Sequence, residues 1–183
     1  MGPWGRMRVR SVGLLLAVTV VSAACAFATV KPTAVTAPPQ KYRSLVIGEV
    51  AGEKVSAELK TKFVNALKEK LTAAQVFDTV VISGQGDAPA PSVTLTGTIS
   101  EFDEGSGALR SLIGFGAGRA KVTGVFRLAD ETRELAQFSA TRTYAGGLGI
   151  GGVGFLSMEA LLDRLAATAV ESVQQWATGA ALE

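Results

Sequence analysis

The spacing of apolar residues from residue 43 onward predicts a domain with five strands. Continuous runs rich in Val, Leu and Ile predict buried strands at 43–52 and 76–83. Apolar residues alternate with threonine or charged residues further along, and this pattern predicts half-buried strands at 93–99, 120–128 and 134–145.

Two amphipathic helices interrupt and follow these strands. The first has apolar residues at helical spacing, at Val55, Leu59, Phe63, Leu67 and Leu71. The second covers 155–177, and Ser157 is its candidate N-cap because a serine oxygen accepts from the unpaired amides of a first helical turn. The element order is therefore β-α-β-β-β-α.

This order predicts an α+β fold, with a mixed, mainly antiparallel sheet and two helices packed on one face. If the last four strands form an antiparallel meander, the segments 103–118 and 146–154 leave the sheet at the same end. The chain is then expected to enter the first strand at that end, with 84–91 and the turn at Asp130 at the far end.

The N-terminal segment reads as an export signal. Arg6, Arg8 and Arg10 precede the uncharged stretch 11–24, which ends in small residues before Cys25, the single cysteine. Cleavage there and lipid attachment to Cys25 predict a membrane lipoprotein. Two alternatives remain open.

One alternative is cleavage after Ala28, which discards the cysteine, and the other is an uncleaved anchor over 11–30. All three place the rest of the chain outside the cytoplasm. Because Ala26 rather than aspartate follows the cysteine, we expect an outer-membrane lipoprotein that faces the periplasm.

Domain boundaries follow from these features. We expect an export signal at 1–24, a lipid-anchored Pro/Ala/Thr linker at 25–42, one α+β domain at 43–178 and a tail at 179–183. In a polyproline conformation the linker reaches at most about 50 Å from the membrane.

Composition narrows the function. Without the three signal arginines, 15 basic and 16 acidic residues remain, so the domain lacks the positive charge expected of a nucleic-acid-binding protein. The chain has no histidine, the commonest general base and transition-metal ligand, and one cysteine forms no intrachain disulfide. We therefore expect no enzyme, metal or cofactor.

The two glycine-rich segments mix glycine with apolar residues, whereas surface segments are ordinarily polar. These apolar residues either bury against each other or form a contact surface for an envelope protein, for a second copy of the chain or for lipid. The candidate interaction residues are Arg110, Leu112, Ile113, Phe115, Leu148, Ile150 and Val153.

A family resemblance rests on the same region. The string from Gly97 to Gly105, followed by Arg110, the Gly-Phe-Gly-Ala-Gly run at 114–118 and Asp130, resembles the domain-of-unknown-function-4410 family of bacterial lipoproteins. The resemblance spans about residues 43 to 175. It implies an envelope lipoprotein without known catalytic residues.

Other chemistry finds little support. The 149–154 segment matches G-x-G-x-x-G, but the chain has no second strand after it to carry the acid that a dinucleotide ribose needs. Glu101 and Asp103 are spaced to share a strand face as an acid pair. The prediction is a non-enzymatic, periplasm-facing interaction or assembly module; a membrane-inserting or oligomer-forming glycine-rich protein is the main alternative, and a nucleotide-binding enzyme is the weakest.

Overall fold

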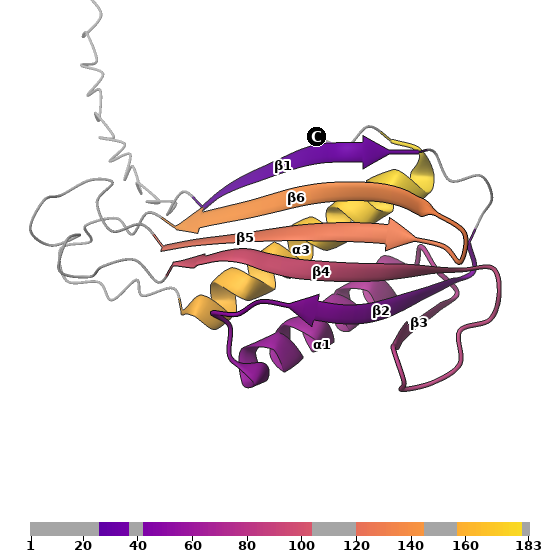
Figure 1. The fold of residues 1–183 in the computed structure, drawn as a ribbon, viewed down its shortest axis with the longest axis horizontal. Helices are drawn as coiled ribbons and strands as arrows, with labels where there is room; N and C mark the ends of the chain where they lie inside the picture. The colour runs from indigo at the N-terminus through magenta and orange to yellow at the C-terminus, as the bar shows by residue number, and fades with distance from the viewer. Residues whose placement is uncertain (1–25, 37–41, 104–119, 145–156, 181–183) are drawn as a thin grey trace, which may run out of the picture.

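A computed structural model describes residues 26–36, 42–103, 120–144 and 157–180. It contains one six-stranded sheet with the strand order β1-β6-β5-β4-β2-β3, and two helices that lie on the same face of that sheet (Figure 1). The elements are β1 (Ala26–Val35), β2 (Ser44–Ala51), α1 (Ala57–Ala74), β3 (Thr79–Ile82), β4 (Ser92–Asp103), β5 (Ala120–Ala129), β6 (Glu134–Tyr144) and α3 (Met158–Thr178).

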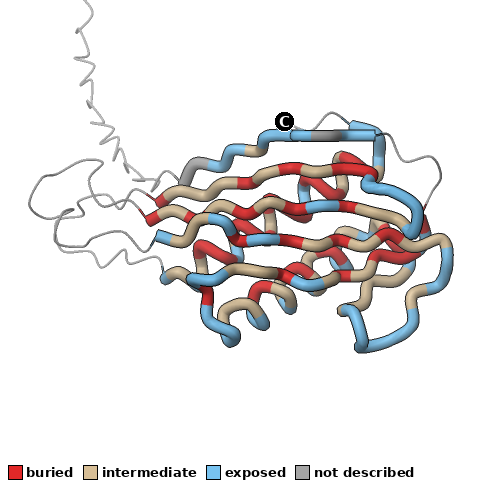
Figure 2. The backbone as a smooth tube through the Cα atoms, in the orientation of Figure 1, coloured by how far each residue is buried: buried red, intermediate tan, exposed pale blue. Residues whose placement is uncertain are grey.

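The predicted α+β class is confirmed, as are both helices on one face. Burial alternates along β4 and β5 with the period of two expected for strands with one covered face (Figure 2). Ser157 caps α3 as predicted, because its Oγ accepts a hydrogen bond from the amide of Ala160 at 3.1 Å.

The prediction of a linker at 25–42 is wrong for most of that segment, because Ala26–Val35 forms the edge strand β1. Its backbone pairs antiparallel with β6, from Ala26 opposite Tyr144 to Val35 opposite Ala136. An edge strand can form without a regular apolar pattern, because hydrogen bonds from its backbone to the neighbouring strand hold it in place. Pro32, which lacks an amide, is tolerated at the edge beside a register shift.

The predicted antiparallel pairing of the strands at 76–83 and 93–99, which are β3 and β4, is also wrong. Both β3 and β4 pair with β2 in parallel, on its two sides. Ser44, the first residue of β2, therefore lies beside Ser92, the first residue of β4, at the far end of the sheet. The chain enters β2 at that far end, and not at the end where β4 finishes.

One aromatic cluster organises the core beneath the sheet. The ring of Phe126 on β5 lies 5.5 Å from that of Phe138 on β6 and 6.1 Å from that of Phe63 on α1. All three side chains are almost fully buried. The cluster joins the middle of the sheet to the first helix.

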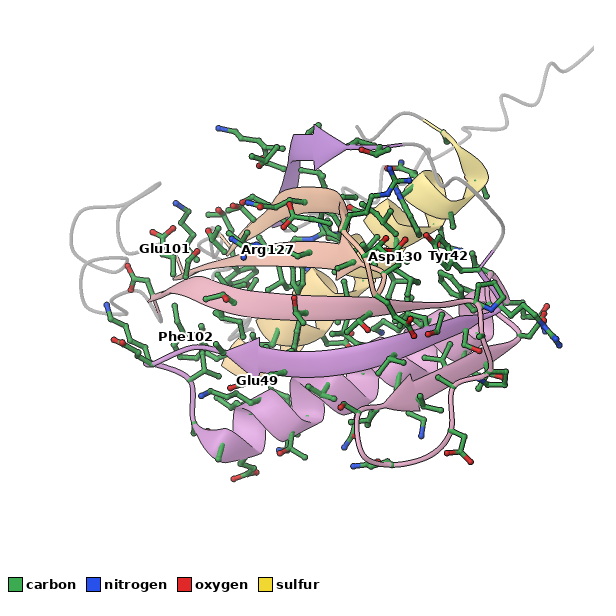
Figure 3. All side chains as sticks on the ribbon, turned by 45° about the vertical axis from the view of Figure 1, so that its right-hand side comes forward. Tyr42, Glu49, Glu101, Phe102, Arg127 and Asp130 are labelled. Atoms are coloured by element: carbon green, nitrogen blue, oxygen red, sulfur yellow. The ribbon has the colours of Figure 1, made fainter. Side chains whose placement is uncertain are left out.

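The far end of the sheet is held by Asp130, which accepts four hydrogen bonds. Its Oδ1 accepts from the amides of Thr132 and Arg133 and from the Thr132 hydroxyl, at 2.7–3.0 Å, and its Oδ2 accepts from Tyr42 Oη at 2.8 Å. Figure 3 shows Tyr42 and Asp130 side by side. These bonds, that of the Thr132 hydroxyl above all, hold the pKa of Asp130 well below its usual value.

Stability at high pH reports on this contact. Burial, and then the hydrogen bond to Asp130, raise the pKa of Tyr42 to about 12. A raised folded-state pKa stabilises the protein below about pH 10, and this contribution is lost as the pH rises through about 12. We expect Tyr42→Phe to lower the free energy of unfolding by about 1 kcal/mol at neutral pH and to reduce its fall between these two pH values. Urea titrations of both proteins across this range measure the difference, and parallel pH profiles would contradict the assignment.

Candidate functional site

Four strand termini meet at one end of the sheet. Asp103, the last residue of β4, pairs with Lys121 of β5, and Ala120 pairs with Tyr144, the last residue of β6. Ala26, the first residue of β1, also pairs with Tyr144. Both glycine-rich segments therefore leave the sheet at the same end, as predicted. This end is here called the glycine end.

The predicted site residues themselves lie outside the described residues. They are Cys25, Arg110, Leu112, Ile113, Phe115, Leu148, Ile150 and Val153. The structure establishes where the segments that carry them start and finish. Cys25 directly precedes Ala26, which lies at the glycine end, although the route differs from the predicted one because the chain arrives through β1 and not through β2.

A polar network crosses the open face of the sheet near the glycine end. Glu101 accepts hydrogen bonds from Lys121 Nζ at 2.7 Å and from Thr123 Oγ1 at 3.1 Å, and Thr123 in turn lies 3.0 Å from the hydroxyl of Thr141. The Lys121 ammonium lowers the pKa of Glu101 below its usual value. Glu101 and Asp103 share this face, as the spacing predicts. Their surroundings tie three strands together and keep Glu101 ionised, which suits a structural role more than a proton donor.

The covered face carries a charged residue that the sequence analysis did not single out. Arg142 on β6 stands between Ala140 and Tyr144, both buried, and its own side chain is half-buried on the helix side. Its Nε donates to Thr168 Oγ1 of α3 at 2.6 Å. The period-two pattern of β6 contains the signal, since it puts an arginine at an inward-facing position.

The described neighbours of Arg142 are a neutral hydroxyl, one acid and a second arginine. The Thr168 hydroxyl, itself 1% exposed, donates to the carbonyl of Arg164, one turn earlier on α3. Burial lowers the pKa of the Arg142 guanidinium, Glu171 opposes this effect, and the positive charge of Arg164 adds to it. Among the ion pairs of the described residues, none involves Arg142 or Arg164.

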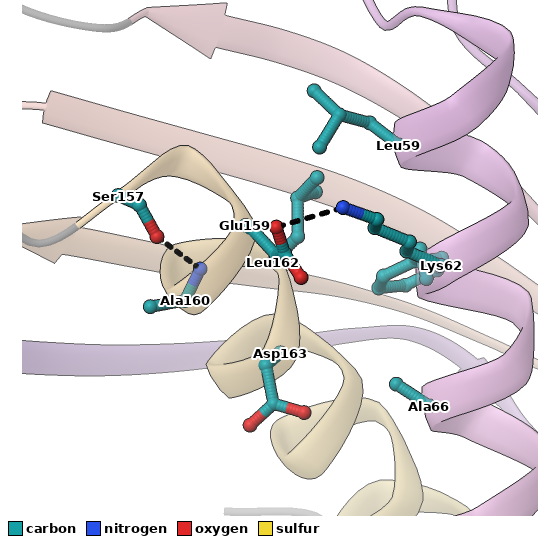
Figure 4. A pocket seen from close by; sticks show the side chains of 9 residues that line it. Leu59, Lys62, Ala66, Ser157, Glu159, Ala160, Leu162 and Asp163 are labelled. Carbon is teal, nitrogen blue, oxygen red and sulfur yellow. Dashed lines mark hydrogen bonds and ion pairs between the residues drawn. The ribbon is translucent and has the colours of Figure 1, made fainter.

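A groove of about 370 Å³ lies between the first turns of α1 and α3 (Figure 4). Leu59, Phe63 and Leu162 line it with apolar surface. Lys62 bridges the two helices at its rim, with its Nζ 3.0 Å from Glu159 Oε2. The groove is shallow and ion-paired at its rim, and nothing in it supplies a nucleophile with its base.

In the described part of the chain, no group of three or more Cys, Asp or Glu side chains is placed to hold a metal ion. None of the helices found there is both long enough and apolar enough to cross a membrane.

A family model described as "Domain of unknown function (DUF4410)" matches residues 47–147, more than half of the 183-residue chain. The match covers β4, β5 and the glycine-rich segment between them. No curated protein matches the chain.

Two solved structures share the fold. A point variant of the PelC dodecamer from Paraburkholderia phytofirmans is 20% identical, with a TM-score of 0.54 over 81% of this chain and 98% of that chain. The PelC dodecamer from the same organism in another crystal form is 17% identical, with a TM-score of 0.51 over 78% of this chain and 96% of that chain. At these identities the likeness establishes the fold alone.

Proposed function

The chain belongs to the DUF4410 family, whose function is unknown, and from this premise we propose that it is a non-enzymatic lipoprotein of the bacterial envelope that assembles with copies of itself. The proposed contact surface is formed by the glycine-rich segments 104–119 and 145–156. One observation carries the proposal: both segments leave the sheet at the glycine end.

A shared end allows two segments to act as one surface. The pairing of Ala120 with Tyr144 puts the end of one segment on the strand next to the start of the other. The segments contribute apolar residues that include Leu112, Phe115 and Ile150. Apolar residues grouped in this way make a surface that is stabilised when a partner covers it.

Self-association is favoured over an unrelated partner because two solved structures that share the fold are described as dodecamers. A closed ring needs two different patches on each subunit, since each copy contacts its neighbours head to tail. The glycine end supplies one such patch in this proposal. The membrane side is set by Cys25, which precedes Ala26 at the same end, so anchor and contact surface face the outer membrane together from the periplasm.

A photo-crosslinking side chain at Phe115 or Ile150 tests the contact surface in cells. We expect adducts at multiples of the mass of the chain, because the same surface meets a second copy. The matched control is Asp87, an exposed residue at the far end of the sheet, where no such adduct is expected. Adducts with lipid alone would favour membrane insertion, and the absence of adducts would indicate that the apolar residues pack within one chain.

The same strains test the anchor and the absence of nucleotide chemistry. A labelled fatty acid is expected to mark the protein, and Cys25→Ala is expected to lose the label completely. Label that persists in this variant would contradict attachment at Cys25.

Dinucleotide binding that saturates at micromolar concentration would contradict the non-enzymatic assignment and point to the 149–154 segment.

A further inference from the structure

Arg142 is a half-buried cation whose hydrogen-bond partner on α3 is a neutral hydroxyl. A cation on the covered face of a sheet loses hydration, and buried charges ordinarily have a charged partner. Here the hydrogen-bond partner is the neutral hydroxyl of Thr168, and Nε supplies only one of the five N–H donors of the guanidinium. No buried side-chain N or O atom lacks a partner in the described part of the chain, so each remaining donor of Arg142 either has a partner or reaches the surface.

A second arginine joins the first in the same cluster. Arg164 and Thr168 lie one turn apart on α3, and the Thr168 hydroxyl bonds both Arg142 and the carbonyl of Arg164. Glu171 is the acid whose charge acts on Arg142, so the described residues of this cluster are two arginines and one acid. The cluster has a net positive charge. It suits a ligand that carries one negative charge and several acceptor oxygens, since guanidinium groups bind phosphate through paired hydrogen bonds.

The location of the cluster favours a membrane lipid as the source of a phosphate ligand. Arg142 is two residues from Tyr144 and therefore about 7 Å from the glycine end. On the neighbouring strand it is paired with Ala28, three residues after Cys25. Ala28 has a short side chain and is exposed. A lipid on Cys25 brings the headgroups of the membrane to this end of the sheet.

We propose that Arg142 and Arg164 bind the phosphate of an anionic phospholipid headgroup beside the anchor. The choice of a lipid over free phosphate rests on the proposed lipoprotein function. Binding at this site adds a second, charge-specific contact to the single chain on Cys25, and stable anchoring generally needs two such signals.

Thermal unfolding of the full chain, purified in a non-ionic detergent, tests the site without relying on the anchor. The probes are dihexanoyl phosphatidylglycerol, dihexanoyl phosphatidylcholine and inorganic phosphate, each below any micelle-forming concentration. A ligand that binds the folded state raises Tm, and we expect phosphatidylglycerol in excess to raise it by about 4 °C or more. We expect phosphatidylcholine and inorganic phosphate to raise it by less than a quarter of that shift.

Variants separate binding from folding. Arg142→Met and Arg164→Gln are each expected to lose the phosphatidylglycerol shift. Arg142→Met is expected to keep or raise the Tm of the ligand-free protein, because a half-buried cation with a neutral partner is replaced by an apolar side chain of similar length. The matched control is Arg133→Gln, at an exposed arginine of the far end, which keeps the full shift.

Three results would overturn the proposal. They are the lack of a phosphatidylglycerol shift in the wild type, an undiminished shift in Arg142→Met and Arg164→Gln, and an equal shift with inorganic phosphate, which would make the ligand a free anion. Failure of the fatty-acid label on Cys25 is a separate outcome, since the short-chain lipids need no anchor. A phosphatidylglycerol shift without that label would support headgroup binding and contradict the lipoprotein assignment.

Discussion

Replacing Gly124 with alanine is expected to lower the free energy of unfolding by about 2 kcal/mol, although alanine is intrinsically the better strand residue. A Cβ at position 124 of β5 would lie 2.8 Å from two ring carbons of Phe126 and 3.3 Å from Cδ2 of Leu165 on α3. The Phe126 ring cannot easily move away, because the rings of Phe63 and Phe138 stack against it. Overpacking of a tight core therefore outweighs the gain in backbone entropy.

Equilibrium denaturation in urea measures this effect, and a second substitution identifies its cause. Phe126→Leu removes the ring carbons that the new Cβ would meet, so the cost of Gly124→Ala is expected to shrink in the double variant. Gly48→Ala is the matched control on β2. There a Cβ would meet the methyl of Thr96 at 3.0 Å, on the open face, where a side chain has room to rotate. Equal losses at Gly48 and Gly124 would contradict the role of the Phe126 ring.

The parts of the fold that could be predicted are those in which local pattern and tertiary position agree. The alternation along β4, β5 and β6 identifies which residues face the helices, and consecutive antiparallel strands then bring both glycine-rich segments to one end. The cap at Ser157 is equally local, since an N-cap depends on the hydrogen bond to its own first turn.

The wrong predictions concern the pairing of strands that are far apart in the sequence. Strand β2 pairs in parallel with both β3 and β4. Parallel strands are joined by long connections and not by a tight hairpin turn, so no short sequence motif shows which strands are neighbours. Strand β1 is rich in alanine and contains Lys31 and Pro32, residue types that are depleted in strands, so propensity alone favours a linker. Its stability comes from backbone pairing with β6, which no local pattern reveals.

The inward-facing position of Arg142 could have been predicted from the sequence. The alternation that assigns Ala140 and Tyr144 to the covered face assigns Arg142 to it as well. A charged side chain that faces the covered side of a sheet loses hydration, which costs free energy. Charged residues that a fold keeps at such positions are therefore candidates for binding sites.

Trp176 contacts the chain just after β1, at the far end of the sheet from the proposed anchor, and adds to the backbone pairing that holds β1 on β6. The side chain is 1% exposed near the end of α3, and its Nε1 donates to the carbonyl of Thr36 at 3.0 Å. Its ring stacks on that of Tyr42 at 5.9 Å. Thr36 follows β1 and Tyr42 precedes β2, so one indole contacts the chain on both sides of residues 37–41. The polyproline reach of about 50 Å does not apply while β1 is paired with β6.

We expect Trp176→Ala to lower the free energy of unfolding by about 3–5 kcal/mol, because it removes a large, fully packed side chain. Trp176→Phe keeps an aromatic ring for Tyr42 but loses the donor to Thr36, and we expect a loss of about 1–2 kcal/mol from the unmet carbonyl and the smaller ring. Urea denaturation measures both values, and hydrogen exchange shows where the loosening occurs. In Trp176→Phe the amides of β1 and of Thr36 should exchange faster while those of β4 stay protected, because β4 pairs with strands that Trp176 does not hold. Uniformly faster exchange across the sheet would contradict a local role and make Trp176 a general core residue.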